Sequence, residues 1–288
     1  MNLADAFIKP LPGISPGIYA AADFKAVVEI VYAHAGIALP PGKAMLVYSR
    51  LAPLVRESAC GTFANYIEKV RADQSELNRA VAALTTNHTF FYREPRHFEH
   101  FEQEVRPSLL RNIDAGHPVR LWSAGCSSGE ETWSLAMTLL GRERSEGTRI
   151  AAGDIRVLAN DIAPQALAKG IAAIYLIKDL KPVPRGLTRL WTKQTGDTAR
   201  IAQEARKFVR FRNLNLQGEW PIKRKFQVIF CRNVMIYFDR ETKERLVARF
   251  ARQLVPGGHL YIGHSERVSG PADSELEMLS PTIYRRRG

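Results

Sequence analysis

The sequence predicts an α/β protein, in which a mostly parallel, doubly wound sheet follows an all-α subdomain and carries a small inserted β flap. Three observations predict this fold. After residue 118, short apolar runs alternate with amphipathic helical patterns, which is typical of a parallel sheet covered on both faces. Only helical periodicity is found from about residue 22 to 86. Between residues 192 and 212 the alternation stops, and apolar residues stand among polar ones.

The N-terminal part of the chain is expected to hold a tail and a helical domain. Residues 1–20 are rich in proline, glycine and alanine, which predicts a flexible tail. Apolar residues then recur at helical spacing in four segments of residues 21–86, for example at Phe24, Val27 and Val31. Short helices with short connections predict one small all-α unit.

The rest of the chain is expected to form a linker with a long helix over residues 87–118 and an α/β domain over 119–288. The long helix should begin near Glu94-Pro95, because proline suits the first turn of a helix. The expected strands are 119–124, 157–162, 226–231 and 259–263, and the expected helices are 129–142, 164–173 and 241–254. The flap is expected near residues 192–212.

Composition restricts the class of protein. The net charge of +12, from 41 basic and 29 acidic residues, favours a polyanionic partner such as nucleic acid, an anionic membrane or an acidic protein surface. Three cysteines are too few for a disulfide framework, and no apolar stretch approaches the roughly 18 residues of a membrane span. The N-terminus also lacks the pattern of a secretory signal. We therefore expect a cytoplasmic protein with no membrane insertion.

A metal site is not expected. His97 and His100 share a helix face, but no cysteine or third ligand clusters with them in the sequence. Both are interpreted as surface residues.

A glycine turn over residues 125–131, Gly-Cys-Ser-Ser-Gly-Glu-Glu, follows the first expected strand and leads into a helix. Gly125 and Gly129 permit positive φ and let the backbone approach a ligand closely. The turn lacks both the Gly-x-Gly-x-x-Gly spacing of a dinucleotide site and the lysine of a phosphate loop. Its two glutamates would repel pyrophosphate but can receive an ammonium or sulfonium. The turn therefore favours an adenosyl-type ligand.

Asp161 ends the next expected strand. A carboxylate at this place can accept hydrogen bonds from both ribose hydroxyls, as acidic residues do in other doubly wound sheets. Alternatively, Asp161 caps the helix that starts at Pro164.

Two further segments combine aromatic and polar residues. In the first, core packing explains the aromatics of residues 86–94 but not their polar companions, Asn87, Thr89 and Arg93. The second, residues 226–238, is a buried strand that should end at the carboxyl edge of the sheet, where ligands bind in open α/β folds. Three polar residues then lie at the mouth: Arg232, Asn233 and Tyr237.

Together these segments resemble the chemotaxis receptor methyltransferases, the CheR family, from about residue 20 to the end of the chain. The most specific parts are Asn-x-Thr-x-Phe-(Phe/Tyr)-Arg and Phe-Cys-Arg-Asn-Val-Met-Ile-Tyr-Phe, with Gly263-His264-Ser265-Glu266 on the late strand. The resemblance implies a Rossmann-like methyltransferase sheet, S-adenosylmethionine as cofactor and S-adenosylhomocysteine as product. It also implies a protein-glutamate O-methyltransferase that forms glutamate 5-O-methyl esters on chemoreceptors for sensory adaptation.

The resemblance implies a set of cofactor-binding residues: Asn87, Thr89, Arg93, Glu130, Asp161, Asn215, Leu216, Arg232 and Asn233. Within this set, Glu130 should hold the amino-acid end of the cofactor and Asp161 its ribose. Asn215 and Leu216 should flank the adenine, with Asn213-Leu214 as a rival register.

Arg93 and Tyr237 are the candidate catalytic residues. A glutamate acceptor, with a reference pKa of about 4.3, is already ionised at pH 7, so the reaction needs no strong general base. Arg93 can pin the carboxylate through a charge-assisted hydrogen bond, and Tyr237 can orient the carboxylate or the methyl group. Alternatively, Tyr237 is a core aromatic with a solvated hydroxyl.

The receptor is expected to dock on the helical domain. Lys43, Arg50 and Arg56 are spaced 7 and 6 residues apart, which predicts a basic stripe that can align a glutamate-rich receptor coiled coil. The alternative is a merely solvated helix face. The flap has a short turn with one glycine, Thr195-Gly196-Asp197-Thr198, so we expect no dependence on a receptor tail peptide. We expect a monomer.

Two other classes of protein compete with this interpretation. The fold and the charge also suit a nucleic-acid methyltransferase, which stacks a flipped base in its pocket. However, Arg232-Asn233-Val234 stands where amino-methylating enzymes carry an Asp/Asn-Pro-Pro-aromatic segment, so no nucleic-acid partner is expected. The other class is an inactive receptor-binding adaptor, against which the intact Arg93, Glu130 and Tyr237 argue.

Overall fold

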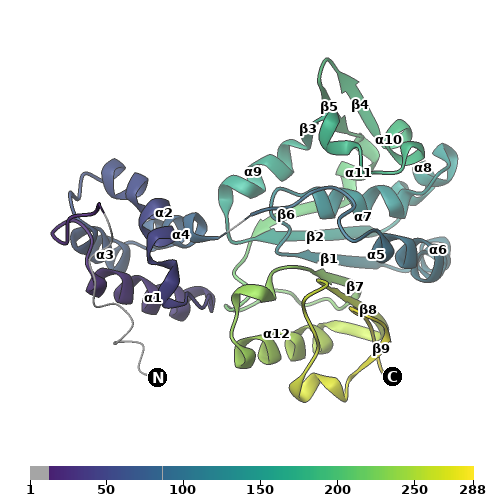
Figure 1. Cartoon of the computed structure of the whole chain (residues 1–288). Helices are drawn as coiled ribbons and strands as arrows, with labels where there is room; N and C mark the ends of the chain where they lie inside the picture. Colours follow the sequence, from purple (N-terminus) through teal and green to yellow (C-terminus); the bar gives the residue numbers. More distant parts are fainter. Residues whose placement is uncertain (1–12, 86) are drawn as a thin grey trace. The chain divides into compact units, whose positions relative to one another are not determined.

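The computed structural model describes residues 13–85 and 87–288, which divide into two compact units. The smaller unit contains the residues up to 85 together with 217–219 and 237–242, and the larger unit contains the remainder (Figure 1). The expected tail lies largely outside the described residues. Tyr19, which that tail included, is buried and packs on Phe63 with 4.4 Å between the ring centroids.

The smaller unit contains the four expected helices. They are α1 Ala21–Ala35, α2 Ala44–Glu57, α3 Phe63–Ala72 and α4 Gln74–Leu84, with a 3₁₀ turn at Pro41–Lys43. Side-chain caps fix where two of them begin, because Thr62 accepts a hydrogen bond from the N–H of Asn65, and Asp73 accepts from those of Ser75 and Glu76. Their apolar faces, which the 3.6-residue periodicity predicted, are buried against one another.

The larger unit is built on a seven-stranded sheet with the order β6-β2-β1-β7-β8-β10-β9. The strands are β1 Val119–Ala124, β2 Ile155–Asp161, β6 Val209–Asn213, β7 Phe226–Cys231, β8 Leu254–Ile262, β9 Leu276–Ser280 and β10 Ile283–Arg286. The first five strands in spatial order run parallel to one another, and β10 runs antiparallel to both of its neighbours, β8 and β9. This confirms the mostly parallel sheet. From β1 the chain adds strands first on one side and then on the other, so the order reverses between β1 and β7, where such sheets bind ligands.

Helices cover both faces of the sheet. They are α5 Pro95–His100, α6 Arg106–Asp114, α7 Glu130–Leu140, α8 Arg144–Ala152, α9 Pro164–Ala172, α10 Arg185–Trp191, α11 Gln203–Phe208 and α12 Arg240–Gln253. Short 3₁₀ turns lie at Ile177–Leu180, Met235–Tyr237 and Gly270–Asp273. None of the helices in residues 13–85 and 87–288 is both long and apolar enough to cross a membrane.

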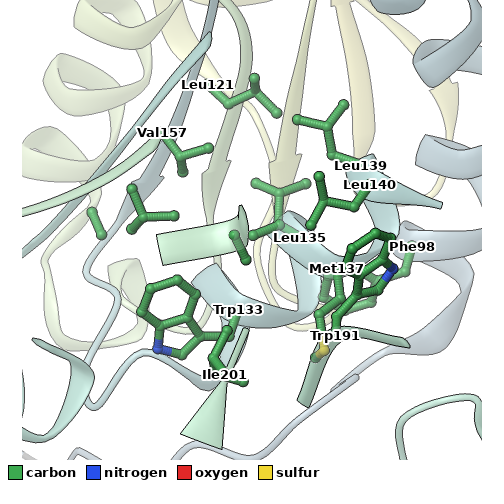
Figure 2. Close-up of a cluster of buried hydrophobic side chains, with 14 of the residues drawn as sticks. Phe98, Leu121, Trp133, Leu135, Met137, Leu139, Leu140, Val157, Trp191 and Ile201 are labelled. Carbon is green, nitrogen blue, oxygen red and sulfur yellow. The ribbon is translucent and has the colours of Figure 1, made fainter. Parts of the chain in front are cut away.

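Alternation along β1 divides the core into two layers. Leu121 packs with Leu135 and other residues of α7 in one layer, which Figure 2 shows together with Val157 of β2. The next residue, Trp122, points to the other face and contacts Phe250 of α12 with 5.3 Å between the ring centroids. Because both faces are buried, the strands are apolar without the polar alternation of a half-exposed sheet.

Three expectations about elements need correction. The long helix from Glu94-Pro95 is interrupted by a π-helix, Phe101–Val105, because Pro107 lacks the N–H that would donate within the helix and its ring crowds the preceding turn. Helix α8 was not expected. Strand β8 begins at Leu254, before the start of the expected strand 259–263, and includes the Pro-Gly-Gly segment of residues 256–258.

The inserted flap is smaller than expected and includes an earlier strand. It is the antiparallel sheet β3-β5-β4, formed by β3 Ile174–Leu176, β4 Thr192–Thr195 and β5 Thr198–Ile201. Residues 209–212, which the expected flap included, instead belong to β6 at the edge of the main sheet. There Val209 and Phe211 are buried while Arg210 and Arg212 are exposed.

Candidate active site

The site lies along the carboxyl edge of the parallel strands. Because β1, β2, β6, β7 and β8 run in the same direction, the loops that follow them meet at one edge. These loops carry the polar residues that the sequence singled out: Glu130 after β1, Asp161 at the end of β2, Asn215 after β6 and Asn233 after β7.

The glycine turn is shaped by packing against other parts of the protein. Gly125 and Gly129 have φ of +73° and +93°, as expected. A Cβ on Gly125 would lie 2.3 Å from Val234 Cγ2, and one on Gly129 would lie 3.0 Å from Gly170 Cα. Glycine is therefore required at these two positions because the backbone packs closely on Val234 and on Gly170.

The two glutamates of the turn face different surroundings. Glu130, the first residue of α7, accepts hydrogen bonds from Ser128 Oγ on both carboxylate oxygens, at 3.0 and 2.8 Å. Burial raises its pKa, and the Ser128 hydroxyl opposes this rise. Glu131 instead accepts from Ser123 Oγ at 2.8 Å and lies 3.3 Å from Arg232 Nη1. Only Glu130 thus remains available for a cationic ligand, whereas the sequence suggested both.

Asp161 joins the glycine turn to the end of β2. Its Oδ2 accepts a hydrogen bond from the Ser127 N–H at 2.8 Å, and its Oδ1 accepts from the Ala163 N–H at 2.9 Å. Burial raises the pKa of Asp161, and these two donors oppose the rise. Helix α9 has Ala163 as its N-cap, without a side-chain cap, so the interpretation of Asp161 as the cap is wrong.

The segment after β6 holds the two rival adenine pairs. The Asn213 side chain donates to the carbonyls of Asp161 and Ile162, at 3.2 and 3.0 Å. The Leu214 carbonyl accepts from Asn160 Nδ2 at 2.9 Å. Asn213 and Leu214 are thus tied to the end of β2. The Leu216 carbonyl also accepts hydrogen bonds, from Trp220 Nε1 at 3.2 Å and Arg249 Nη1 at 2.8 Å, so hydrogen bonding does not distinguish the two pairs.

Residues 87–94 pass close to the glycine turn. The Asn87 carbonyl accepts a hydrogen bond from Ser127 Oγ at 3.0 Å, and Thr89 is partly buried. Arg93 Nη1 donates to the His88 carbonyl at 3.2 Å, and its guanidinium carbon lies 5.6 Å from the centroid of the Phe90 ring. The Arg93 side chain therefore packs against His88 and Phe90 of the same segment.

The sequence reasoning missed the surroundings of Arg232 and the role of Glu266. Arg232, whose side chain is 2% exposed, contacts Glu94 and Glu131. Glu266 Oε2 accepts hydrogen bonds from the N–H groups of Gly263 (2.6 Å) and Asn233 (3.2 Å). The available signal was the Gly-His-Ser-Glu motif, to which no role was given.

The two histidines are not surface residues. His97 is buried and its Nε2 lies 2.8 Å from Thr282 Oγ1; burial first, and then Arg232, lowers its pKa to about 4. His100 is partly buried, with Nδ1 2.8 Å from the Tyr261 hydroxyl. The prediction of a surface position was wrong because the helix face that the two histidines share packs on the sheet. In the part of the chain that the structure describes, no cluster of three His, Cys, Asp or Glu side chains could hold a metal ion.

The other predicted residues belong to the smaller unit. Tyr237 is partly buried, and its carbonyl accepts a hydrogen bond from the Ala38 N–H at 2.8 Å. Lys43, Arg50 and Arg56 are all exposed. At 3.6 residues per turn, however, Arg56 lies about 120° around α2 from Arg50, so the three do not form one stripe. Arg50 and Arg56 instead flank the solvent-facing side of the helix.

The fold and the donor groups define a class of protein. A carboxylate at the start of the first crossover helix suits a cationic amino-acid group, and a second carboxylate at the end of β2 suits ribose hydroxyls. The turn has no lysine for a phosphate. These residues fit S-adenosylmethionine, and with the doubly wound sheet they indicate a Rossmann-like methyltransferase that depends on this cofactor.

Comparison with known proteins identifies the family. Residues 87–284 match the family model described as "CheR methyltransferase, SAM binding domain", and residues 22–85 match "CheR methyltransferase, all-alpha domain". A probable chemotaxis protein methyltransferase of Rhizobium etli is 40% identical over 89% of this chain and 96% of its own length. Chemotaxis protein methyltransferase 2 of Pseudomonas aeruginosa is 38% identical over 92% and 93%. The chain belongs to the CheR methyltransferase family.

Proposed function

We propose that this chain transfers the methyl group of S-adenosylmethionine to glutamate side-chain carboxylates of chemoreceptors, forming glutamate 5-O-methyl esters for sensory adaptation. The observation that carries the proposal is the match of both domains, over most of the chain, to relatives named as chemotaxis protein methyltransferases. A cytoplasmic, monomeric enzyme is part of the same proposal.

S-adenosylmethionine supplies a methyl group bonded to a sulfonium. In this proposal Glu130 binds the ammonium of the cofactor and Asp161 its ribose, while Asn215 and Leu216 flank the adenine. The remaining contacts come from Asn87, Thr89, Arg93 and Asn233. Each oxygen of the Asp161 carboxylate accepts one hydrogen bond from a backbone N–H and keeps a second lone pair for a ribose hydroxyl. This supports the proposed role of Asp161.

The proposed step forms a bond between a glutamate oxygen and the methyl carbon and breaks the bond between that carbon and sulfur. The sulfonium leaves as a neutral thioether, so no proton moves and no general base is required. The chain must therefore hold an ionised carboxylate in line with the methyl group and exclude water. We assign the first task to the Arg93 guanidinium, and orientation of the carboxylate or methyl to the Tyr237 hydroxyl.

The proposed docking surface is the basic, solvent-facing side of α2, with Lys43 before it and Arg50 and Arg56 at its two margins. All three side chains are exposed, and the acceptor, a glutamate-rich coiled coil, has the opposite charge. Strands β4 and β5 are joined by only Gly196 and Asp197. Such a short hairpin supports a mode of action that does not need the receptor's tail.

Transfer of a radiolabelled methyl group to chemoreceptor-containing membranes tests the function. We expect label that mild alkali releases as methanol, because esters hydrolyse in base and N-methyl groups do not. Label in nucleic acid would support the methyltransferase alternative. Binding of the cofactor without any transfer would support the inactive adaptor.

Substitution of Arg93 tests the proposed mechanism. Arg93→Ala should lower kcat by about a hundredfold, since loss of orientation at the reacting centre costs roughly that much. The melting temperature should stay close to that of the wild type, because the side chain is only partly buried. An unchanged kcat would remove Arg93 from the catalytic residues.

A further inference from the structure

Arg232 has surroundings that do not suit a cofactor ligand. Its side chain is 2% exposed. Nη2 donates to the carbonyl of Arg93 and lies 3.4 Å from Glu94 Oε2, and Nη1 donates to Glu131 Oε2 at 3.3 Å. Nε is buried without a hydrogen-bond partner. A guanidinium that binds a ligand must present N–H groups to an open pocket, and here both terminal nitrogens contact the protein.

The carbonyl that Arg232 contacts belongs to an unusual turn. Tyr92 and Glu94, on either side of Arg93, have φ of +56° and +57°. For residues other than glycine this conformation costs about 1–2 kcal/mol each, so the surrounding structure must hold the turn. Tyr92 is held at its N–H by Ser134 Oγ of α7, at 3.0 Å.

Glu94 and Glu131 balance the buried charge of Arg232. Glu94 Oε1 accepts hydrogen bonds from the N–H of His264 at 3.3 Å and from Asn233 Nδ2 at 3.4 Å. Burial raises the pKa of Glu94, but Arg232, with His264 and His97, outweighs it and the pKa is lowered. Burial raises the pKa of Glu131, and Arg232 opposes that rise. The arginine thus joins the end of β7 to the turn before α5 and to the start of α7.

We propose that Arg232 is a positioning residue for methyl transfer: its buried guanidinium fixes the main chain at Arg93 and thereby directs the Arg93 side chain toward the acceptor. Glu94 and Glu131 act as its counter-ions. The catalytic part of this inference rests on the proposed function, in which Arg93 holds the acceptor carboxylate. The structural part, that Arg232 holds the turn and does not bind cofactor, stands separately.

The experiment compares wild-type protein with Arg232→Lys. Lysine keeps the charge but loses the planar fork that reaches a carbonyl and two carboxylates at once. We expect the Kd for S-adenosylhomocysteine, measured by calorimetry, to stay within about threefold, because no cofactor contact is lost. Hydrogen exchange in a peptide covering residues 90–95 should accelerate about tenfold or more, and kcat should fall at least tenfold.

A matched control is available in the same domain. Arg106 also joins carbonyls to a carboxylate, with Nε donating to Leu139 O at 2.9 Å and Nη2 to Glu146, but at the far end of α7. Arg106→Lys should lower the melting temperature and leave both kcat and exchange at residues 90–95 unchanged. In an Arg93→Ala background, Arg232→Lys should cause no further loss of kcat, because Arg232 acts through Arg93.

A tenfold or larger rise in the Kd for S-adenosylhomocysteine, with unchanged exchange at residues 90–95, would overturn the inference and make Arg232 a cofactor ligand. If Arg232→Lys does not fold, Glu94→Gln removes one counter-ion and should give the same pattern with smaller changes; unchanged exchange in that variant would also contradict the inference. Calorimetry and exchange need no acceptor. A wild-type protein that methylates no receptor would therefore refute the proposed function without affecting this test.

Discussion

Glu130 shows, at the scale of a single residue, how a binding charge reduces stability. Burial raises the pKa of its carboxyl group, so the folded protein holds the proton more tightly than the unfolded chain, whose glutamate pKa is about 4.3. Stability from this group is therefore present below about pH 4 and is lost as pH rises through the folded-state pKa. At pH 7, which lies above the unfolded-state pKa, the raised pKa of Glu130 therefore lowers the stability of the fold.

Glu130→Gln should consequently unfold at a higher urea concentration than the wild type at pH 7, and this difference should shrink toward pH 4. The same variant should bind S-adenosylhomocysteine about ten- to a hundredfold more weakly, since a hydrogen bond to a charged group contributes about 1.5–3 kcal/mol. Urea titrations between pH 4 and 7 and calorimetry measure the two effects. A variant that is less stable than the wild type at pH 7 would contradict a destabilising role of the Glu130 charge.

The sequence could place charged residues at the edge of the sheet but not the direction of their side chains. Glu130 and Glu131 are adjacent and look equivalent in the sequence, yet Glu131 turns inward to Ser123 and Arg232. The contact between Glu131 and Arg232 joins residues 101 positions apart in the chain, and local patterns do not contain such contacts. The family resemblance likewise predicted that Arg232 binds the cofactor, but it did not predict that the Arg232 side chain is buried.

At the scale of an element, the β1–α7 turn depends on Gly125. Alanine there would have a strained φ of +73° and a Cβ 2.3 Å from Val234. We expect Gly125→Ala to destabilise by about 2–5 kcal/mol, from about 1–2 for the backbone and about 1–3 for overpacking. Chemical denaturation measures this loss.

Gly116 offers a control for that prediction, because it has a φ of +72° but no atom within 4 Å of the place that a Cβ would occupy. Gly116→Ala should therefore cost only the backbone part, about 1–2 kcal/mol. Adding Val234→Ala to Gly125→Ala should recover part of the lost stability by removing the overlap. Equal losses at the two glycines would show that Val234 plays no role.

Elements with strong periodicity were predictable, and those without it were not. The four helices of the smaller unit and strands β1, β2 and β7 follow their apolar patterns closely. Helix α8 buries only Gly147 and Ile150, so its sequence shows no apolar stripe. Strand β6 has a clear alternation, but only the short helix α11 separates it from the flap hairpin in the sequence. Its pairing with β2 is what shows that it belongs to the main sheet.

At the scale of the whole molecule, the +12 net charge should assist the encounter with an acidic receptor. Arg50→Glu combined with Arg56→Glu should raise the KM for receptor about tenfold and leave cofactor affinity unchanged, since exposed ion pairs contribute up to about 1 kcal/mol each. The wild-type KM should also rise with salt, because the Debye length falls from about 10 Å at 0.1 M to about 3 Å at 1 M.

The pair Lys25→Glu and Arg71→Glu changes the net charge equally at exposed positions of α1 and α3 and serves as the control. It should raise the KM much less than the changes on α2. Deletion of the receptor's last residues should have little effect on the rate. If tail deletion caused a large loss of rate, and the two charge-reversal pairs raised the KM equally, the docking element would be the flap and not the α2 surface.

The central claim is that the methyl group is placed on a glutamate carboxylate, and fragment mass spectrometry of the receptor tests it most directly. The receptor's cytoplasmic region, incubated with the protein and S-adenosylmethionine, should gain methyl groups at glutamate side chains, and these should disappear after mild alkali. Replacing each modified glutamate by alanine should abolish the gain at that position. Alkali-stable methyl groups on other side chains, or no gain in the receptor at all, would contradict the account.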